Sequence, residues 1–151
     1  MEMFFDPMEL SLNHIQIIVR AMYELAEADQ VHHTEMVLLK EFYESCRQDV
    51  NGLTDFNELI QQPFDIEAAN EILNTRELKE TLINSCLFLA FADGTYSKEE
   101  KETIARFAES LGIEENVRAE LEDHVKDILL MQISRISNID ALKKVAKGLE
   151  K

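Results

Sequence analysis

The stretch LAFADGTYSKEEKETIARFAESLGI, residues 89–113, decides the fold class of this 151-residue chain. Its apolar first part stops at the turn dipeptide Asp93-Gly94. Ser97 and Glu100 follow as a capping box, in which a Ser oxygen and a Glu carboxylate satisfy backbone N–H groups at a helix start. Apolar residues then recur at helical spacing until a glycine suited to a helix end. The stretch therefore predicts helix, turn, helix.

The rest of the chain has the same helical character. It contains only four Gly and two Pro, which indicates few turns, and no segment alternates as a strand does. Asp6-Pro7 is a good helix start, and Thr54 and Asp65 are the expected caps of two short helices. We expect one all-α domain of six to eight helices. The expected helices cover about residues 7–28, 34–49, 55–61, 66–74, 78–93, 98–111 and 117–129, and a last one begins at a cap on Ser137.

The charge balance limits the possible partners. The chain has 15 basic and 30 acidic residues, a net charge of −15. This argues against nucleic acid and anionic membranes, which attract basic proteins, and it favours cations or basic proteins as partners. The alternative is that the negative charge binds no partner and only keeps the protein soluble.

Cysteines and apolar runs point to the cytoplasm. Cys46 and Cys86 are too few for a disulfide scaffold and lie among apolar residues, so we expect buried thiols. The N-terminal residues do not resemble a signal peptide. The longest apolar run, residues 86–92, is far too short to span a membrane. We therefore expect a soluble cytoplasmic protein.

The stretch LAEADQVHHTEMVLLKEFYESC, residues 25–46, resembles a second copy of the opening stretch. Asp29 aligns with Asp93 at an offset of 64, and Glu35 aligns with Glu100 at an offset of 65. We interpret this as a duplicated helical hairpin whose two copies pack in one core. The single domain 1–151 then consists of halves at about 8–50 and 75–113, short helices within 54–74, and C-terminal helices within 114–150.

The two turns place carboxylates in contrasting positions. Asp93 and Asp29 follow helix C-termini, where negative charge is unfavourable, whereas Glu100 and Glu35 occupy first turns, where it is favourable. A divalent cation bound by these oxygens would offset the cost at the aspartates. The alternative is purely structural, because Asp-Gly is a common turn and Glu100 is explained as a cap.

The first turn also contains His32 and His33, and imidazole with carboxylate suits a transition metal. The alternative is that both histidines bind no metal and are simply exposed to water. Neither turn is an EF-hand, because position 12 counted from Asp93 is Ile104 and from Asp29 is Lys40, where that loop requires Glu. The identity of any metal is left open.

The pattern A-x-A-D-G-x-Φ-S-x-x-E-x-x-x-I-x-x-F at residues 90–107 resembles the TerB-like family. This family includes the tellurite-resistance protein TerB and the N-terminal region of certain membrane-anchored J-domain co-chaperones. The resemblance implies an all-α fold with duplicated hairpins, an acidic metal site and a role in stress-response assemblies. Asp93 and Glu100 match the motif directly. Asp29 and Glu35 match it in a first half where Gln30 replaces Gly and the turn is one residue shorter.

Two other classes of function compete with the cation-binding module. A metal-free interaction or scaffold domain would dock a basic protein partner on its acidic helical faces. An enzyme is not expected, because the chain has no H-E-x-x-H, no phosphate-binding glycine loop and no nucleophile elbow. A metal-assisted hydrolase built on the acidic cluster is the one enzymatic alternative.

Overall fold

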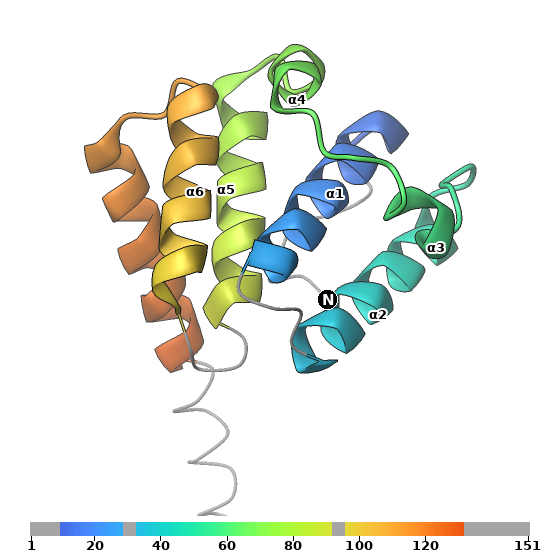
Figure 1. The fold of residues 1–151 in the computed structure, drawn as a ribbon, viewed down its shortest axis with the longest axis horizontal. Coiled ribbons are helices and arrows are strands. Elements are labelled where there is room, and N and C mark those ends of the chain that lie inside the picture. Colours follow the sequence, from blue (N-terminus) through green and yellow to red (C-terminus); the bar gives the residue numbers. More distant parts are fainter. Residues whose placement is uncertain (1–9, 29–32, 92–95, 132–151) are drawn as a thin grey trace, which may run out of the picture.

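The computed structural model describes residues 10–28, 33–91 and 96–131, and for residues 33–35 it describes the backbone alone. These ranges contain seven helices and no strand, which confirms the all-helical prediction (Figure 1). The helices are α1 (Leu12–Ala28), α2 (His33–Asp49), α3 (Phe56–Leu59), α4 (Ile66–Ile72), α5 (Arg76–Phe91), α6 (Lys98–Ser110) and a seventh at residues 115–131.

Helix α1 is the centre of the packing. It contacts α5 most extensively and also packs against α2, α4 and α6. In Figure 1, α5, α6 and the helix of residues 115–131 stand side by side, while α2 and α3 lie on the other side of α1. The short α3 and α4 lie on the connection between the two sides. This arrangement gives one continuous core, which extends from α1 to the 115–131 helix.

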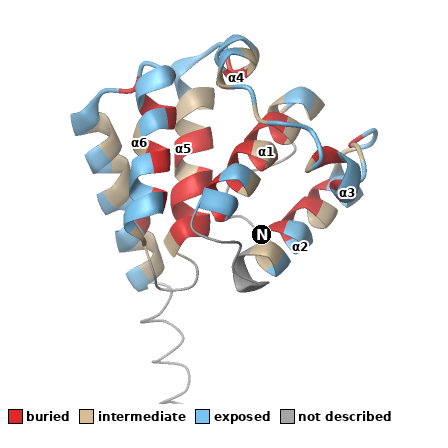
Figure 2. Ribbon diagram, in the orientation of Figure 1, coloured by how far each residue is buried: buried red, intermediate tan, exposed pale blue. Residues whose placement is uncertain are grey.

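Burial follows from these positions. Helix α5 is buried almost all round, because α1, α2 and α6 pack on it (Figure 2). Its buried residues run nearly without a break from Leu82 to Ala90. Helix α6 is amphipathic instead, with one buried stripe and one solvent-facing side. The described core is therefore centred on α1 and α5: α5 is buried along most of its length, and α1 is amphipathic, with Glu24 and Glu27 exposed on its outer side.

Most helix boundaries agree with the sequence predictions. Asp65 caps α4 by accepting from the backbone N–H groups of Glu67 and Ala68. The capping box of Ser97 and Glu100 opens α6 as expected. Gly112 follows that helix with φ of 75°, a left-handed conformation that glycine adopts without strain.

The predicted cap of α3 is wrong by one residue. Asp55, not Thr54, is the N-cap, because its Oδ2 accepts from Asn57 N at 3.2 Å. Thr54 has a tertiary role instead. Its carbonyl accepts from the Tyr43 hydroxyl at 2.6 Å, and its N–H donates to Gln16 Oε1 at 3.0 Å.

Two further predictions concern the chain ends. The first described helix begins at Leu12, because residues 10 and 11 are not helical and Ser11 Oγ accepts from His14 N. Asp6-Pro7 and the predicted cap Ser137 lie outside the described residues. Within those residues, no helix is both long enough and apolar enough to cross a membrane.

Equivalent positions of the two predicted hairpins share their environment. Leu25 and Leu89 are buried, as are Leu39 with Ile104 and Phe42 with Phe107. In the alignment of the two halves, the two residues of each pair occupy the same position. Their common burial supports the alignment, while the duplication itself stays a prediction.

Candidate functional site

The candidate site is the turn between α5 and α6, together with its predicted counterpart between α1 and α2. Figure 1 shows that α1 ends and α2 begins at the same end of the molecule where α5 ends and α6 begins. The fold therefore orients the two hairpins alike. Three of the six predicted ligands, Asp29, His32 and Asp93, lie outside the described residues. His33 and Glu35 lie in the first turn of α2, and the structure describes their backbone alone. Glu100 is described in full.

Glu100 is a buried carboxylate at the start of α6, with 1% of the residue exposed. Its Oε1 accepts from Ser97 N at 3.1 Å, and Ser97 Oγ accepts from Glu100 N at 3.1 Å. Negative charge is favourable here because the N-terminus of a helix carries partial positive charge. The carboxylate therefore already stabilises the fold, whatever else it binds.

Tyr96 joins this turn to the seventh helix. Its ring packs edge-on against Phe91, the last residue of α5, with centroids 4.6 Å apart. Its hydroxyl donates to Glu122 Oε1 at 3.0 Å, and Arg118 Nη1 lies 3.5 Å from the same oxygen. One aromatic residue therefore bridges the end of α5, the start of α6 and the 115–131 helix.

Two lysines extend the same cluster. Lys101 Nζ lies 5.2 Å from the centroid of the Tyr96 ring, and Lys126 Nζ lies 5.7 Å from that of Phe91. Tyr96 precedes the N-cap and Lys101 is the fourth helical residue, the two positions of a hydrophobic staple. A cation–π contact thus replaces the usual apolar pair. Burial, and then the Glu122 carboxylate, raises the pKa of the Tyr96 hydroxyl above its usual range.

Sequence reasoning did not single out Tyr96, although it occupies the Φ position of the quoted motif. The local signal was an aromatic residue just before a helix cap, which is a staple position. Its hydrogen-bond partner, Glu122, is 26 residues away and had no local signal.

The described residues alone do not assemble a metal centre. Among residues 10–28, 33–91 and 96–131, no three His, Cys, Asp or Glu side chains gather closely enough to hold an ion. The donor chemistry of the predicted set still fits a divalent cation, because Asp and Glu supply the oxygens that such ions prefer. A cation site at this end of the molecule therefore depends on Asp93 and Asp29, and it stays a prediction.

Both cysteines are buried, free thiols, as the sequence predicts. Burial, and then Asp49, raises the pKa of Cys46 to about 11. Burial also raises the pKa of Cys86, with a smaller contribution from Glu24. A thiol with such a pKa is protonated at neutral pH and is a poor nucleophile or metal ligand.

Two adjoining grooves lie elsewhere on the surface, where the segment between α3 and α4 crosses α1 and α6. Their volumes are about 330 and 260 Å³, and both are lined by Glu24 and Phe64. Phe64 packs edge-on against Phe107 with centroids 5.1 Å apart, which holds this segment on the core. Desolvation raises the pKa of Glu24, while nearby Arg106 opposes the shift. The connection is therefore anchored by the Phe64–Phe107 contact and by Arg20, whose Nη1 donates to Gln62 Oε1 and to the Pro63 carbonyl.

Comparison with known proteins gives one family. A family model described as "Tellurite resistance protein TerB" matches residues 22–123, which extend from α1 into the 115–131 helix and include both hairpin turns. The match confirms the family expected from the motif at residues 90–107. No curated protein and no solved structure matches the chain.

Proposed function

The chain belongs to the TerB family of tellurite resistance proteins, and from this premise we propose that it acts as a non-catalytic, cytoplasmic binding module in a tellurite-resistance-type stress response. Its binding function is to hold a divalent cation at the α5–α6 turn. Asp93 and Glu100 supply the oxygen ligands there. The α1–α2 turn contributes Asp29 and Glu35, with His32 or His33 if the ion is a transition metal.

The observation that carries this proposal is the placement of Glu100. A buried carboxylate, held by Ser97 N, lies in the first turn of α6, nine residues after the end of α5 and seven residues after Asp93. The Tyr96 cluster anchors the same connection to a third helix. A bound cation would neutralise the carboxylates of the turn and so stabilise the folded chain.

A metal-free interaction domain is the second candidate, and one observation favours it. Glu100 is fully explained as a helix cap, since both hydrogen bonds of the capping box are present. The net charge of −15 would then serve to attract a basic protein partner. In that case the turn has a structural role alone.

Thermal unfolding of chelator-stripped protein distinguishes the two candidates. We expect Ca²⁺, Mg²⁺, Mn²⁺ or Zn²⁺ to raise the midpoint saturably, because an ion that binds the folded state stabilises it by mass action. Asp93→Asn should abolish the rise. Asp49→Asn is the matched control, because Asp49 is an exposed carboxylate at the C-terminal end of α2, where its charge opposes the helix dipole.

The possible outcomes separate clearly. An ion-specific rise that survives in Asp49→Asn and is lost in Asp93→Asn supports the cation site. A rise that Asp29→Asn also removes would include the first turn in the site. Equal midpoints with and without every ion would exclude cation binding and leave the interaction domain.

A further inference from the structure

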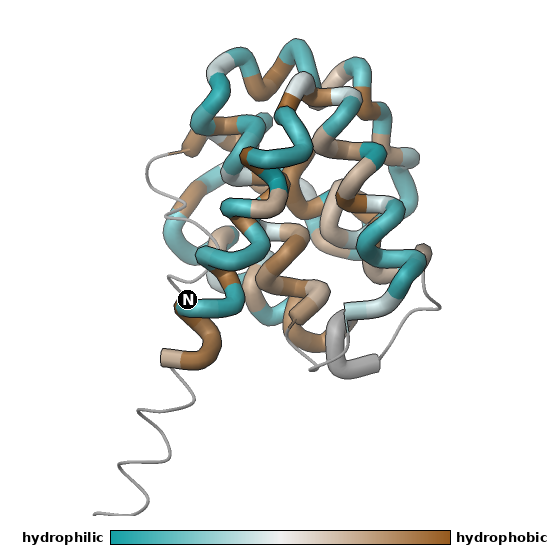
Figure 3. The backbone as a smooth tube through the Cα atoms, turned by 90° about the vertical axis from the view of Figure 1, so that its left-hand side faces the viewer, coloured by the Kyte–Doolittle hydropathy of each residue, from teal (hydrophilic) through white to brown (hydrophobic). Residues whose placement is uncertain are grey.

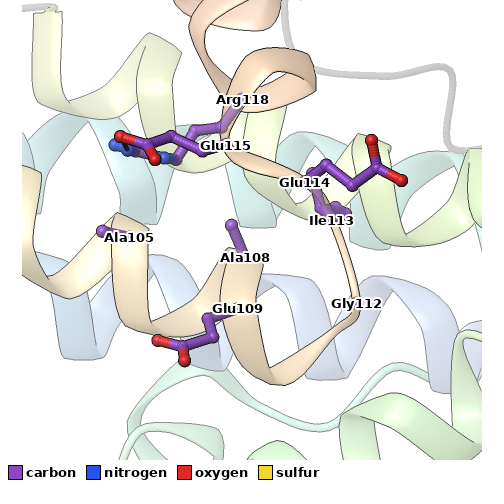
Figure 4. A pocket seen from close by; sticks show the side chains of 8 residues that line it. All are labelled: Ala105, Ala108, Glu109, Gly112, Ile113, Glu114, Glu115 and Arg118. Atoms are coloured by element: carbon purple, nitrogen blue, oxygen red, sulfur yellow. Dashed lines mark ion pairs between the residues drawn. The ribbon is translucent and has the colours of Figure 1, made fainter.

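A cleft at the end of α6 has its basic side chain already paired. The cleft has a volume of about 560 Å³ and lies between the end of α6 and the start of the 115–131 helix (Figure 4). Ala105 and Ala108 form an apolar floor. Arg118 Nη2 lies 3.7 Å from Glu115 Oε1, and Arg118 Nη1 lies 3.5 Å from Glu122 Oε1. Arg118 is therefore engaged within its own helix.

The 115–131 helix ends in two exposed apolar residues. Leu130 is 60% exposed and Met131 is 58% exposed. In Figure 3, which views the molecule from the side of this helix, its lower end is brown. A few exposed apolar side chains are ordinary on a protein surface. These two residues alone therefore do not indicate a binding site.

The groove between α1, α4 and α6 contains unpaired charges of both signs. It has a volume of about 330 Å³ and is lined by Glu24 of α1 and by Arg106 and Glu109 of α6. Among the described residues neither carboxylate has a hydrogen-bond or ion-pair partner, and the Arg106 guanidinium has one, Thr103 Oγ1 at 3.4 Å. In Figure 4 the Glu109 carboxylate also lies apart from the ion pair of the neighbouring cleft. Two carboxylates and one guanidinium thus remain available to a ligand of this groove.

An apolar wall completes the groove and is held in place by the fold. This wall consists of Phe64, Ile66 and Phe107. The rings of Phe64 and Phe107 pack edge-on with centroids 5.1 Å apart. Arg20 Nη1 lies 3.3 Å from both Gln62 Oε1 and the Pro63 carbonyl, and so holds the two residues before Phe64. The wall is therefore preformed, which lowers the entropic cost of binding.

The charges of the groove favour a ligand that carries both signs. A simple cation would lie close to Arg106 and a simple anion close to two carboxylates, so each would meet repulsion as well as attraction. A zwitterion can place its ammonium group at Glu24 and Glu109 and its carboxylate at Arg106. A volume of 330 Å³ is near the lower end of the range of about 300 to 1,000 Å³ usual for ligand sites, which indicates a small molecule.

We propose that this groove binds an α-amino acid with an apolar side chain. The carboxylate of the ligand pairs with Arg106, and its ammonium group pairs with Glu24 and Glu109. Its side chain packs on Phe64 and Phe107. The site is independent of the proposed cation site, because it uses none of the six predicted cation ligands.

Titration of the full-length chain with L-leucine, followed by backbone amide NMR shifts, tests the proposal. N-acetyl-L-leucine lacks the ammonium group and L-leucinamide lacks the carboxylate, so both should bind about fivefold more weakly than leucine, the loss of one partly exposed ion pair. Arg106→Gln should weaken leucine about fivefold but leave leucinamide unchanged. Glu24→Gln with Glu109→Gln should weaken leucine by a similar factor but leave N-acetyl-leucine unchanged. A chelator is present throughout, so that no cation contributes.

The control variants remove the same charges from α2, which lines neither of the two adjoining grooves. They are Arg47→Gln, and Glu41→Gln with Glu44→Gln, and both should bind leucine as the wild type does. Absence of a saturable shift with leucine, or equal weakening in the controls, would overturn the proposal. Equal binding of all three ligands would also overturn it, because the side chain alone would then be recognised. Tighter binding of leucinamide than of leucine would instead indicate a cationic ligand.

Discussion

The carboxylates at the two ends of α6 lie in opposite environments, one buried and one exposed. At the N-terminal end, Glu100 is buried and accepts from the backbone N–H of Ser97. At the C-terminal end, Glu109 is exposed on the rim of a cleft, next to Gly112. Helix N-termini carry N–H groups that need acceptors, whereas C-termini carry carbonyl groups that repel a carboxylate. The same residue type is therefore held by backbone hydrogen bonds at one end of α6 and is exposed to solvent at the other.

The largest effect on stability should come from Glu100→Ala, at the N-terminal end of α6. We expect the free energy of unfolding to fall by about 2 kcal/mol, because the capping box is lost and Ser97 N loses its acceptor. Urea denaturation measures this. Glu99→Ala, one residue earlier and exposed, should change it by no more than about 0.5 kcal/mol. Equal effects of the two variants would show that burial of Glu100 is not what distinguishes this end.

At the C-terminal end of α6, Gly112→Ala should lower the free energy of unfolding by about 1 to 1.5 kcal/mol. Its φ of 75° is strained for a residue with a Cβ atom, although a Cβ placed there would contact nothing within 4 Å. Gly112→Asn should lose less, because Asn tolerates the left-handed conformation better than Ala. The same urea series measures both variants. If Asn were as costly as Ala, backbone conformation would not be the cause.

The smallest effect should come from Tyr96→Phe, which keeps the ring on Phe91 but removes the hydrogen bond to Glu122. We expect a loss of about 0.5 to 1 kcal/mol near pH 7. The raised pKa of Tyr96 means that the folded state holds this proton more tightly than the unfolded state. Its contribution is therefore complete below the ordinary tyrosine pKa of 10.0 and is lost as pH rises through the folded-state value.

Unfolding free energies at neutral and strongly alkaline pH check the last prediction. The difference between wild type and Tyr96→Phe should shrink as pH rises above 10. Tyr23→Phe on α1 serves as the comparison variant, because burial and Glu27 also raise the pKa of Tyr23, but Tyr23 lies outside the α5–α6 turn and has no bond to Glu122. A gap that stayed constant with pH would indicate that the hydroxyl of Tyr96 is not the group that titrates.

Local patterns were enough to predict much of the fold. The caps at Asp65 and Ser97, the helix end at Gly112 and the buried thiols all depend on near neighbours in the chain. The cap of α3 was missed by one residue because Thr54 and Asp55 are adjacent and both are favoured cap types, so the local pattern did not separate them. The backbone of Thr54 instead bonds to Tyr43 and Gln16, which are distant in sequence. Of the candidate site, the structure describes the side chain of Glu100 alone, so the rest of the cation site is still a prediction.

The sequence by itself therefore determined the helical class, the family motif and the capped start of α6, because helix periodicity and capping involve residues three or four apart. The tertiary structure alone decided that Tyr96 bonds to Glu122, that α1 and α5 form the buried centre, and that a cleft opens beside Ala105 and Ala108. These features depend on which helices pack together. That choice is made by burial of apolar surface across the whole chain, and no short stretch of sequence contains it.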